Sequence, residues 1–203
     1  MWIKLCGITH SEDATKAAEL GADAIGFIFA NSPRQIDISS AVKISQNIKI
    51  PRVGVFVNTE LKKIIDIRKH CNLDIIQLHG DESPEFCDAL GGTIIKAFRV
   101  KNAESLIKIK LYSNIWKILL DAYVPGQSGG TGEKINPRYL TDLDLSNIIL
   151  AGGISPDNIK EIIQQYSPFG IDVNSGIEDS PGKKNHQKMK YVIETVKKRG
   201  ENA

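Results

Sequence analysis

Eight short apolar runs occur along the chain, and longer amphipathic stretches separate them. Within each run the apolar residues are continuous instead of alternating with polar ones, which is typical of parallel strands covered on both faces. One run with the stretch that follows it takes roughly 20 to 30 residues, the size of one βα unit. We therefore predict eight strands, at residues 3–6, 24–29, 53–57, 75–78, 94–98, 116–120, 148–151 and 170–173.

Helix signals fall in the stretches between these predicted strands. Ser11 predicts an N-cap for the first helix and Gly21 predicts its C-terminal stop. Pro84 and Pro156 each follow a serine, which predicts helices that begin at those prolines. After the sixth strand, the loop at 127–132 leaves room for only a weak helix over 136–141. The other helices are predicted over residues 39–47, 58–68, 102–111 and 185–199.

The order of these elements predicts an α/β protein with one (β/α)8 barrel of the TIM type. An open, doubly wound sheet also alternates strands and helices, but eight evenly spaced units favour a closed barrel. No proline- or serine-rich linker divides the chain, so the barrel is predicted to span residues 1–203 as a single domain. Because 203 residues are few for such a barrel, its helices and loops are expected to be trimmed.

Composition and charge exclude several classes of protein. Hydrophobic residues make up 41% of the chain and charged residues 25%, which excludes wholesale disorder. A net charge of +2 provides no basic field for non-specific nucleic-acid binding. No apolar run is long enough to cross a bilayer. We therefore expect neither a nucleic-acid partner nor a membrane partner.

Cysteine and histidine positions argue against a disulfide framework and a zinc site. Cys6, Cys71 and Cys87 are an odd number without a close pair, and the four histidines lack ligand spacing. Cys71 and Cys87 fall on predicted helices and are interpreted as packing residues. The segment 130–132 lacks the third glycine of a dinucleotide fingerprint, and no Walker motif is present. We expect a cytoplasmic protein without a metal or a cofactor.

Paired glycine-rich loops follow the seventh and eighth predicted strands. Gly152 and Gly153 come after the seventh strand, and Ser175 and Gly176 come after the eighth. Glycine lets backbone N–H groups approach an anion, and a helix that begins there adds the positive end of its dipole. Tight strand-to-helix turns are the alternative explanation. Because barrels of this type commonly bind phosphate at these two loops, a phosphate site is favoured.

Cys6 and Asp121 each end a predicted strand, where this fold places its chemistry. Cys6 is either a small buried hydrophobe or a group that acts as a thiolate, which a helix N-terminus or a nearby cation favours. A carboxyl at Asp121 lies partly buried in the barrel mouth, where burial favours the protonated form and suits a general acid. The alternative for Asp121 is a structural hydrogen bond to a loop.

Three further polar side chains lie near predicted strand ends. Arg34 follows the second strand and either clamps a carboxylate or phosphate with its planar fork or is an ordinary solvated loop residue. His79 and Arg99 are interpreted as structural or peripheral. Whether these two, or Asp172, touch a substrate stays open.

The short sequence motifs that contain these polar residues resemble those of the phosphoribosylanthranilate isomerase family of tryptophan biosynthesis. The matches run through nearly the whole chain in the order of the family. Each string alone is weakly specific, whereas the ordered set is highly specific. The matching strings are Lys4-Leu5-Cys6-Gly7-Ile8-Thr9, Gly26-Phe27-Ile28-Phe29, Ser32-Pro33-Arg34, Gln77-Leu78-His79-Gly80, Leu120-Asp121, Gly130-Thr131-Gly132, Ala151-Gly152-Gly153-Ile154, Asp172-Val173-Asn174-Ser175-Gly176-Ile177-Glu178 and Pro181-Gly182.

The resemblance implies an Amadori rearrangement of N-(5'-phosphoribosyl)anthranilate to 1-(2-carboxyphenylamino)-1-deoxyribulose 5-phosphate on a trimmed barrel. It implies Cys6 as general base and Asp121 as general acid, without a cofactor. Arg34 would meet the anthranilate carboxylate, and the two glycine loops, at Gly152–Gly153 and Ser175–Gly176, would hold the phosphate.

Two positions depart from the pattern of the family, and two other functions remain as alternatives. Asn174 stands where serine is usual, and Asn185 stands where aspartate is usual. Neither change removes an acid–base group. One alternative is another phosphosugar isomerase or epimerase on the same barrel, and the other is a non-catalytic binder of phosphometabolites. A metal-dependent epimerase would need several inward ligands that the chain lacks, and a binder would need neither Cys6 nor Asp121.

Overall fold

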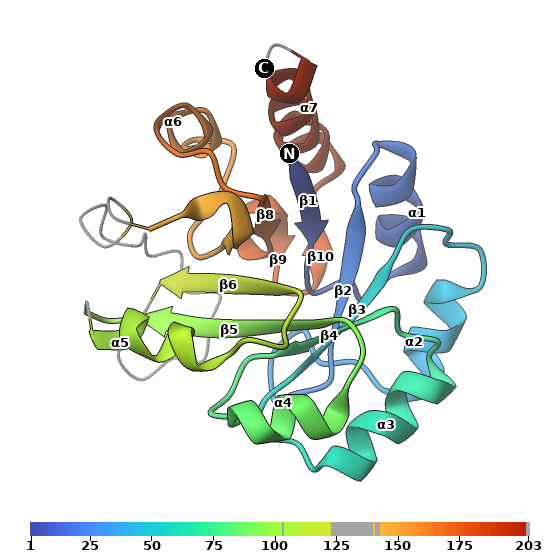
Figure 1. Cartoon of the computed structure of the whole chain (residues 1–203). Coiled ribbons are helices and arrows are strands. Elements are labelled where there is room, and N and C mark those ends of the chain that lie inside the picture. The colour runs from blue at the N-terminus through green and yellow to red at the C-terminus, as the bar shows by residue number, and fades with distance from the viewer. Residues whose placement is uncertain (103, 123–139, 141–142, 202–203) are drawn as a thin grey trace.

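Eight parallel strands close into a barrel in the computed structural model, and each strand pairs with its neighbours in chain order (Figure 1). β1 completes the ring by pairing with β8, where Lys4 is the register partner of Asp172. The predicted (β/α)8 fold class is confirmed. The strands are β1 (Trp2–Leu5), β2 (Ala24–Ile28), β3 (Arg52–Phe56), β4 (Ile75–Leu78), β5 (Ile94–Val100), β6 (Lys117–Ala122), β7 (Ile148–Leu150) and β8 (Gly170–Val173).

The structure describes residues 1–102, 104–122, 140 and 143–201. The predicted loop at 127–132, the glycines at 126, 129 and 132, Thr131, and nearly all of the weak helix expected over 136–141 lie outside these residues.

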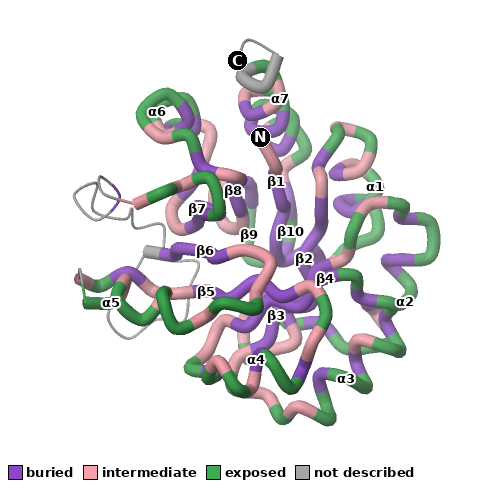
Figure 2. Tube along the Cα trace, viewed as in Figure 1, coloured by how far each residue is buried: buried purple, intermediate pink, exposed green. Residues whose placement is uncertain are grey.

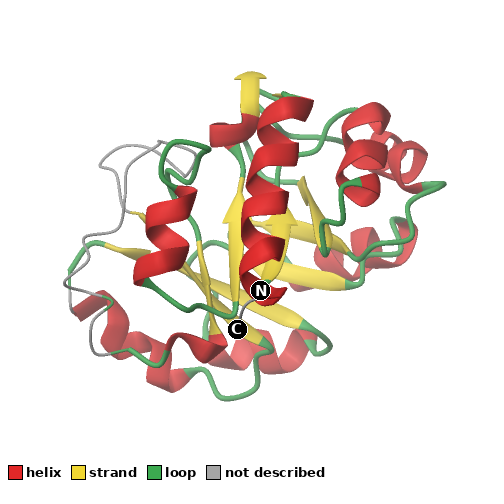
Figure 3. Cartoon of the chain, turned by 90° about the horizontal axis from the view of Figure 1, so that it is seen from above, coloured by secondary structure: helices red, strands yellow, loops and turns green. Residues whose placement is uncertain are grey.

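Helices surround the strands on the outside of the barrel (Figure 3). Apart from α7, with 16 residues, none of the described helices exceeds 10 residues, which agrees with a trimmed barrel. The helices are α1 (Ser11–Glu19), α2 (Ile38–Ser45), α3 (Leu61–His70), α4 (Pro84–Leu90), α5 (Glu104–Ile107), α6 (Ile159–Gln165) and α7 (His186–Glu201). Short 3-10 segments η1 (Lys108–Leu111), η3 (Leu145–Asn147) and η4 (Ser175–Ile177), and the antiparallel pair β9 (Glu178–Ser180) and β10 (Lys183–Lys184), complete the described elements.

Helix starts agree with the sequence prediction at α4 and differ from it at α1 and α6. Ser83 caps α4 by accepting a hydrogen bond from the Phe86 N–H at 3.3 Å, with proline in the first turn. The N-cap of α1 is His10, without a side-chain cap, so the prediction of Ser11 was wrong by one residue.

The second difference is that α6 begins at Ile159 and not at Pro156. The side chain of Asn158 accepts a hydrogen bond from Ser155 N–H at 2.9 Å and donates one to the Gly153 carbonyl at 2.7 Å. These bonds hold the preceding residues in a turn, because an asparagine side chain offers the backbone an alternative to helical hydrogen bonds. The same turn ties the start of α6 to the glycine loop after β7.

The interior of the barrel changes from apolar to polar along its axis. At the N-terminal ends of the strands, the Trp116 ring meets Trp2 and Phe169 edge to face, with centroids 5.7 and 5.5 Å apart. Strands are buried and helices carry the exposed positions (Figure 2). Apolar residues fill the middle of the barrel: Ala24, Val53, Ile75, Ile95, Ala97, Leu119, Ile149 and Ala151. Because successive strand residues point to opposite faces, the inward positions beyond this layer open on the C-terminal mouth.

Candidate active site

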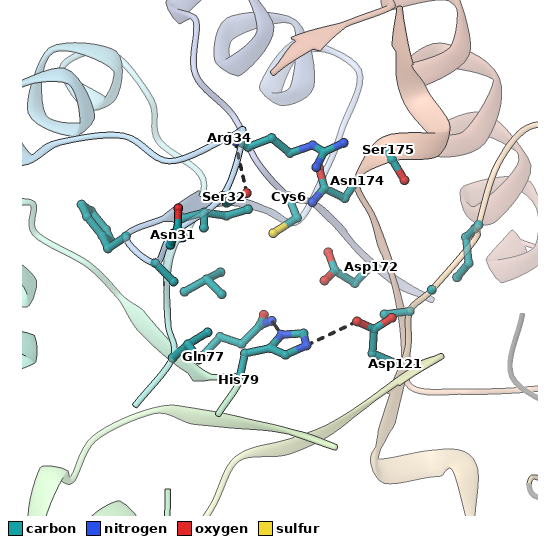
Figure 4. Close-up of a pocket in the computed structure, with 18 of the residues that line it drawn as sticks. Cys6, Asn31, Ser32, Arg34, Gln77, His79, Asp121, Asp172, Asn174 and Ser175 are labelled. Carbon is teal, nitrogen blue, oxygen red and sulfur yellow. Dashed lines mark hydrogen bonds and ion pairs between the residues drawn. The ribbon is translucent and has the colours of Figure 1, made fainter. Parts of the chain in front are cut away.

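A cavity of about 420 Å³ opens among the C-terminal ends of the strands and the loops that follow them. Figure 4 shows side chains from widely separated strands converging on it. All but one of the predicted site residues line this cavity: Cys6, Arg34, Asp121, Gly152, Gly153 and Ser175. Gly176 lies beside Ser175 in η4 and is not in the lining.

Cys6 follows β1 directly, and its N–H donates to the Val173 carbonyl at 2.8 Å, which continues the pairing of β1 with β8. The residue is only 4% exposed. Gly26 leaves it room, because a Cβ at that position would lie 2.8 Å from the Cys6 sulfur. Burial raises the pKa of the Cys6 thiol above its ordinary value, although the nearby Lys4 charge opposes the shift.

Lys4 is a buried charged residue behind the cavity wall that the analysis of strand ends did not single out. Its side chain is fully buried, and its Nζ lies 2.9 Å from Asp172 Oδ1. Asp172 is itself in the cavity lining. A lysine within an apolar strand, two positions before Cys6, was the available signal, because residues i and i+2 of a strand share a face.

Asp121 is the penultimate residue of β6 and is 6% exposed. His79 approaches it from the end of β4, with Nε2 3.3 Å from Asp121 Oδ2 (Figure 4). The other ring nitrogen, Nδ1, lies 2.9 Å from Gln77 Nε2. Of the two interpretations of His79, the peripheral one is wrong because the side chain lies in the cavity wall, whereas a structural role is compatible with its contact with Asp121. Arg99 lines an adjoining cavity and not this one.

Arg34 is buried at 9% exposure, which excludes an ordinary solvated loop residue. Its Nη2 lies 2.7 Å from Glu178 Oε2, and its Nε lies 2.9 Å from Glu178 Oε1. Lys184 Nζ reaches the same carboxylate at 2.8 Å and the Asn174 side-chain oxygen at 3.0 Å. The carboxylate on the fork of Arg34 is thus a protein group, although Arg34 also belongs to the cavity lining.

The two glycine loops lie against each other. Gly152 and Gly153 have φ of +84° and +61°, in the region that favours glycine. A Cβ at Gly176 would collide with the carbonyl oxygen of Ile154, so close contact between the loops requires glycine there. η4 begins at Ser175, whereas α6 begins well beyond Gly153. Any anion at these loops would be held by backbone N–H groups and the Ser175 hydroxyl more than by a long helix.

The described residues include no group of three or more His, Cys, Asp or Glu side chains arranged for a metal ion. None of the described helices is both long enough and apolar enough to cross a membrane.

A closed (β/α)8 barrel with a thiol, a carboxyl and two glycine loops at the C-terminal ends of its strands is typical of the TIM-barrel enzymes, which place their active sites at this face. Comparison with known proteins narrows this class. The family model of N-(5'phosphoribosyl)anthranilate (PRA) isomerase matches residues 3–195. The chain belongs to this family and is an isomerase, so the resemblance in the sequence strings is confirmed.

Individual relatives agree over nearly their whole length. The N-(5'-phosphoribosyl)anthranilate isomerase of Citrifermentans bemidjiense is 42% identical over 200 residues, with 97% of each chain covered. The crystal structure of phosphoribosyl anthranilate isomerase from Thermus thermophilus has a TM-score of 0.85 at 32% identity and covers 98% of this chain and 100% of its own. A structure of the isomerase in complex with reduced 1-(o-carboxyphenylamino)-1-deoxyribulose 5-phosphate has a TM-score of 0.82 at 35% identity, covering 98% and 99%.

Proposed function

We propose that this chain converts N-(5'-phosphoribosyl)anthranilate to 1-(2-carboxyphenylamino)-1-deoxyribulose 5-phosphate, the isomerase step of tryptophan biosynthesis, with Cys6 as general base and Asp121 as general acid. The observation that carries this proposal is the meeting of both side chains in one cavity of a chain that belongs to the family. A relative that binds the reduced product supports the substrate class.

The two proposed groups approach the cavity from different strands. Cys6 follows β1, Asp121 is the penultimate residue of β6, and Asp172 lies between them in the view of Figure 4. A substrate held between them would present one atom to the acid and another to the base, as general acid–base chemistry requires. His79 orients the Asp121 carboxyl through its Nε2, 3.3 Å away.

The proposed reaction consists of proton transfers and the opening of the furanose ring. Protonated Asp121 donates to the furanose ring oxygen, and the C1–O bond breaks to leave an iminium at C1. The Cys6 thiolate then removes the proton from C2, and the electron pair of that C–H bond neutralises the iminium as an enolamine. Tautomerisation of the enolamine gives the ketone. The iminium is itself the electron sink, so the chemistry asks for no redox group.

The ends of the substrate are assigned to the loops. Backbone N–H groups at Gly152–Gly153 and Ser175–Gly176 are proposed to bind the phosphate. Arg34 is proposed to meet the anthranilate carboxylate. Glu178 would then orient the Arg34 guanidinium, because it accepts hydrogen bonds from Nε and Nη2.

The two departures from the family pattern have identifiable partners. Asn174 accepts from Lys184 Nζ through both its backbone oxygen and its side-chain oxygen, at 3.1 and 3.0 Å. Asn185 Oδ1 accepts from the N–H groups of Gln187 and Lys188, so it caps the start of α7 as an aspartate would. Both asparagines fill structural roles that leave the proposed acid and base in place.

We further propose that the protein acts in the cytoplasm and does not bind nucleic acid. Cys6, Cys71 and Cys87 all carry free thiols and are buried, which suits a reducing compartment.

The test is direct assay of the purified chain. Phosphoribosylanthranilate is fluorescent, so its consumption is followed as loss of fluorescence upon addition of enzyme. We expect rapid loss with the wild-type chain and with Cys71→Ala, and strongly slowed loss with Cys6→Ala. If the fluorescence falls no faster with the wild-type chain than without enzyme, the proposal is contradicted.

A further inference from the structure

We propose that Lys4 is a positioning residue whose buried ammonium, held in place by Asp172, is the counter-charge that stabilises the Cys6 thiolate. The inference rests on the proposed function in one respect, namely that Cys6 reacts as a thiolate. Neither the match of the strings nor the fold assigns a role to this lysine.

Geometry places the ammonium beside the sulfur. Lys4 and Cys6 are two residues apart on one strand, so both point into the barrel. A Cβ built at Gly26 on the adjacent strand would lie 2.8 Å from the Cys6 sulfur and 3.3 Å from Lys4 Nζ. The two groups therefore share the space that Gly26 leaves open. No side chain on β2 separates them at this point.

A buried ammonium can stabilise the thiolate only if a neighbouring anion keeps the lysine protonated. Lys4 is 0% exposed, and an isolated lysine in such a place tends to lose its proton. Asp172 is its register partner on β8 and lies 2.9 Å away. Burial lowers the pKa of Lys4, but the charge of Asp172 and that of Cys6 outweigh it and raise the pKa above its ordinary value. Lys4 therefore remains an ammonium at neutral pH.

The charge balance around the sulfur shows why this ammonium matters. Asp172 on β8 disfavours the thiolate, while Lys4 on β1 and Lys184 on β10 favour it. Lys184 shares its charge with Glu178, 2.8 Å away, which also holds Arg34. The charges of Asp121 and His79 also act on Asp172, in opposite directions. Without Lys4, ionised Cys6 and Asp172 would be two neighbouring anions in a buried site.

A purely structural role is the competing explanation, in which Lys4 only neutralises Asp172 and fills the barrel. The two explanations differ in what they predict for the thiol. A structural lysine would alter the free energy of unfolding and leave the titration of Cys6 where it is. A counter-charge would move that titration in a direction that depends on which charge is removed.

The experiment measures alkylation of Cys6 by iodoacetamide as a function of pH. Cys71→Ala and Cys87→Ala are combined as the background, so that Cys6 is the only cysteine of the chain. Lys4→Met removes the charge and keeps the length of the side chain, and Lys4→Arg restores a charge. We expect Lys4→Met to slow alkylation about tenfold or more at pH 8, which corresponds to a shift of about one pKa unit. Lys4→Arg should recover part of that rate.

Asp172→Asn is expected to shift the Cys6 titration in the opposite direction to Lys4→Met. It also tests the proposal if Lys4→Met does not fold. Removing this anion takes away its repulsion of the thiolate and leaves the thiolate as the counter-charge that keeps Lys4 protonated. The Cys6 titration should therefore move to lower pH and alkylation at pH 8 should be faster, provided that the variant has the wild-type near-UV circular dichroism. A folded Lys4→Met or Asp172→Asn variant that titrates like the background protein would overturn the proposal.

Failure of this inference and failure of the proposed function can be told apart, because alkylation needs no turnover. If the chain does not consume phosphoribosylanthranilate but both titrations shift as expected, the counter-charge stands and the proposed function fails. If turnover is normal and its pH profile is the same in Lys4→Met as in the wild type, the counter-charge proposal is wrong and the proposed function is kept.

Discussion

Arg34 and Glu178 form a buried fork, with Nη2 2.7 Å from Oε2 and Nε 2.9 Å from Oε1, between residues 144 positions apart in the chain. The fork joins the loop after β2 to the start of β9 beside the cavity. Lys184 shares the same carboxylate. Glu178 is therefore the common anion of two buried cations, and the shape of the mouth depends on it.

Removing Glu178 should destabilise the protein strongly. Glu178→Ala leaves Arg34 and Lys184 buried without their counter-charge, and breaking a buried pair in this way costs about 3–5 kcal/mol. Urea unfolding at pH 7 measures the loss. Asp179→Ala, at the exposed neighbouring position, is the control and should change the free energy of unfolding by less than about 1 kcal/mol.

The same carboxylate predicts a pH dependence of stability. Burial raises the pKa of Glu178, but the hydrogen bonds of Arg34 and the charge of Lys184 outweigh burial and hold the pKa below its ordinary value. A depressed folded-state pKa gives stability that is fully present above the unfolded-state pKa and is lost as pH falls through the folded-state value. The stability difference between wild type and Glu178→Gln should thus shrink on acidification below the ordinary glutamate range. A difference that grows in acid would contradict this.

Arg34→Ala should weaken productive substrate binding by about 2–5 kcal/mol, since it truncates one partner of a desolvated charge pair. Steady-state kcat/KM measures the loss, and urea unfolding separates it from the loss of the Glu178 contact. Arg34→Lys should recover only part of the activity, because lysine cannot bind bidentately. If folded Arg34→Ala stays within about twofold of wild type in kcat/KM, the role of Arg34 is confined to holding Glu178.

Cys6→Ala and Asp121→Asn should each lower kcat on the order of 10²-fold or more, the usual scale for a lost general base or acid. KM should change much less, because neither group is the proposed anchor for phosphate or carboxylate. Cys71→Ala and Cys87→Ala are matched controls that remove buried thiols outside the cavity and should keep kcat. Wild-type turnover by Cys6→Ala would reject the proposed base.

Inorganic phosphate should inhibit competitively, and Gly153→Asp should raise KM strongly by placing a negative charge at the proposed phosphate loop. Gly153→Ala is the control for backbone strain, because Gly153 has φ of +61°, which disfavours any side chain. The aspartate variant should lose far more substrate affinity than the alanine variant. Equal KM values for the two variants would move the phosphate site elsewhere.

Turnover should survive chelation and exhaustive dialysis unchanged. The proposed steps transfer protons between substrate and side chains and use the substrate iminium as electron sink. The measurement is kcat before and after treatment with EDTA, with addition of divalent cations as the reverse test. Activity that disappears on chelation and returns with a cation would refute the proton-transfer route.

Much of the architecture and part of the site could be predicted from the chain. Continuous apolar runs at βα spacing predict parallel strands buried on both faces, and eight evenly spaced units favour a closed barrel over an open sheet. The barrel in turn places strand ends together, which is why Cys6 and Asp121 could be predicted to share a site. Glycine pairs after the last two strands likewise marked loops whose positive φ and close contact the structure shows.

Other features depended on tertiary structure. The start of α6 at Ile159 was decided by the Asn158 side chain, which competes with helical hydrogen bonding in a way that Pro156 does not reveal. Arg34 finds its partner, Glu178, in the hairpin of β9 and β10. These two strands are short and contain no apolar run, so the sequence pattern does not predict them.

Pairing between the two ends of the sheet is the clearest case. Lys4 lies within an apolar run, and its place two residues before Cys6 indicates a shared face but not the partner of its charge. Its pairing with Asp172 exists because closure brings β1 beside β8 in one particular register. Local sequence determined which segments are strands and which residues end them. Only the closed barrel determined which charges face each other inside it, because ion pairs in a buried site follow from strand register and inward direction, and neither is encoded within a few neighbouring residues.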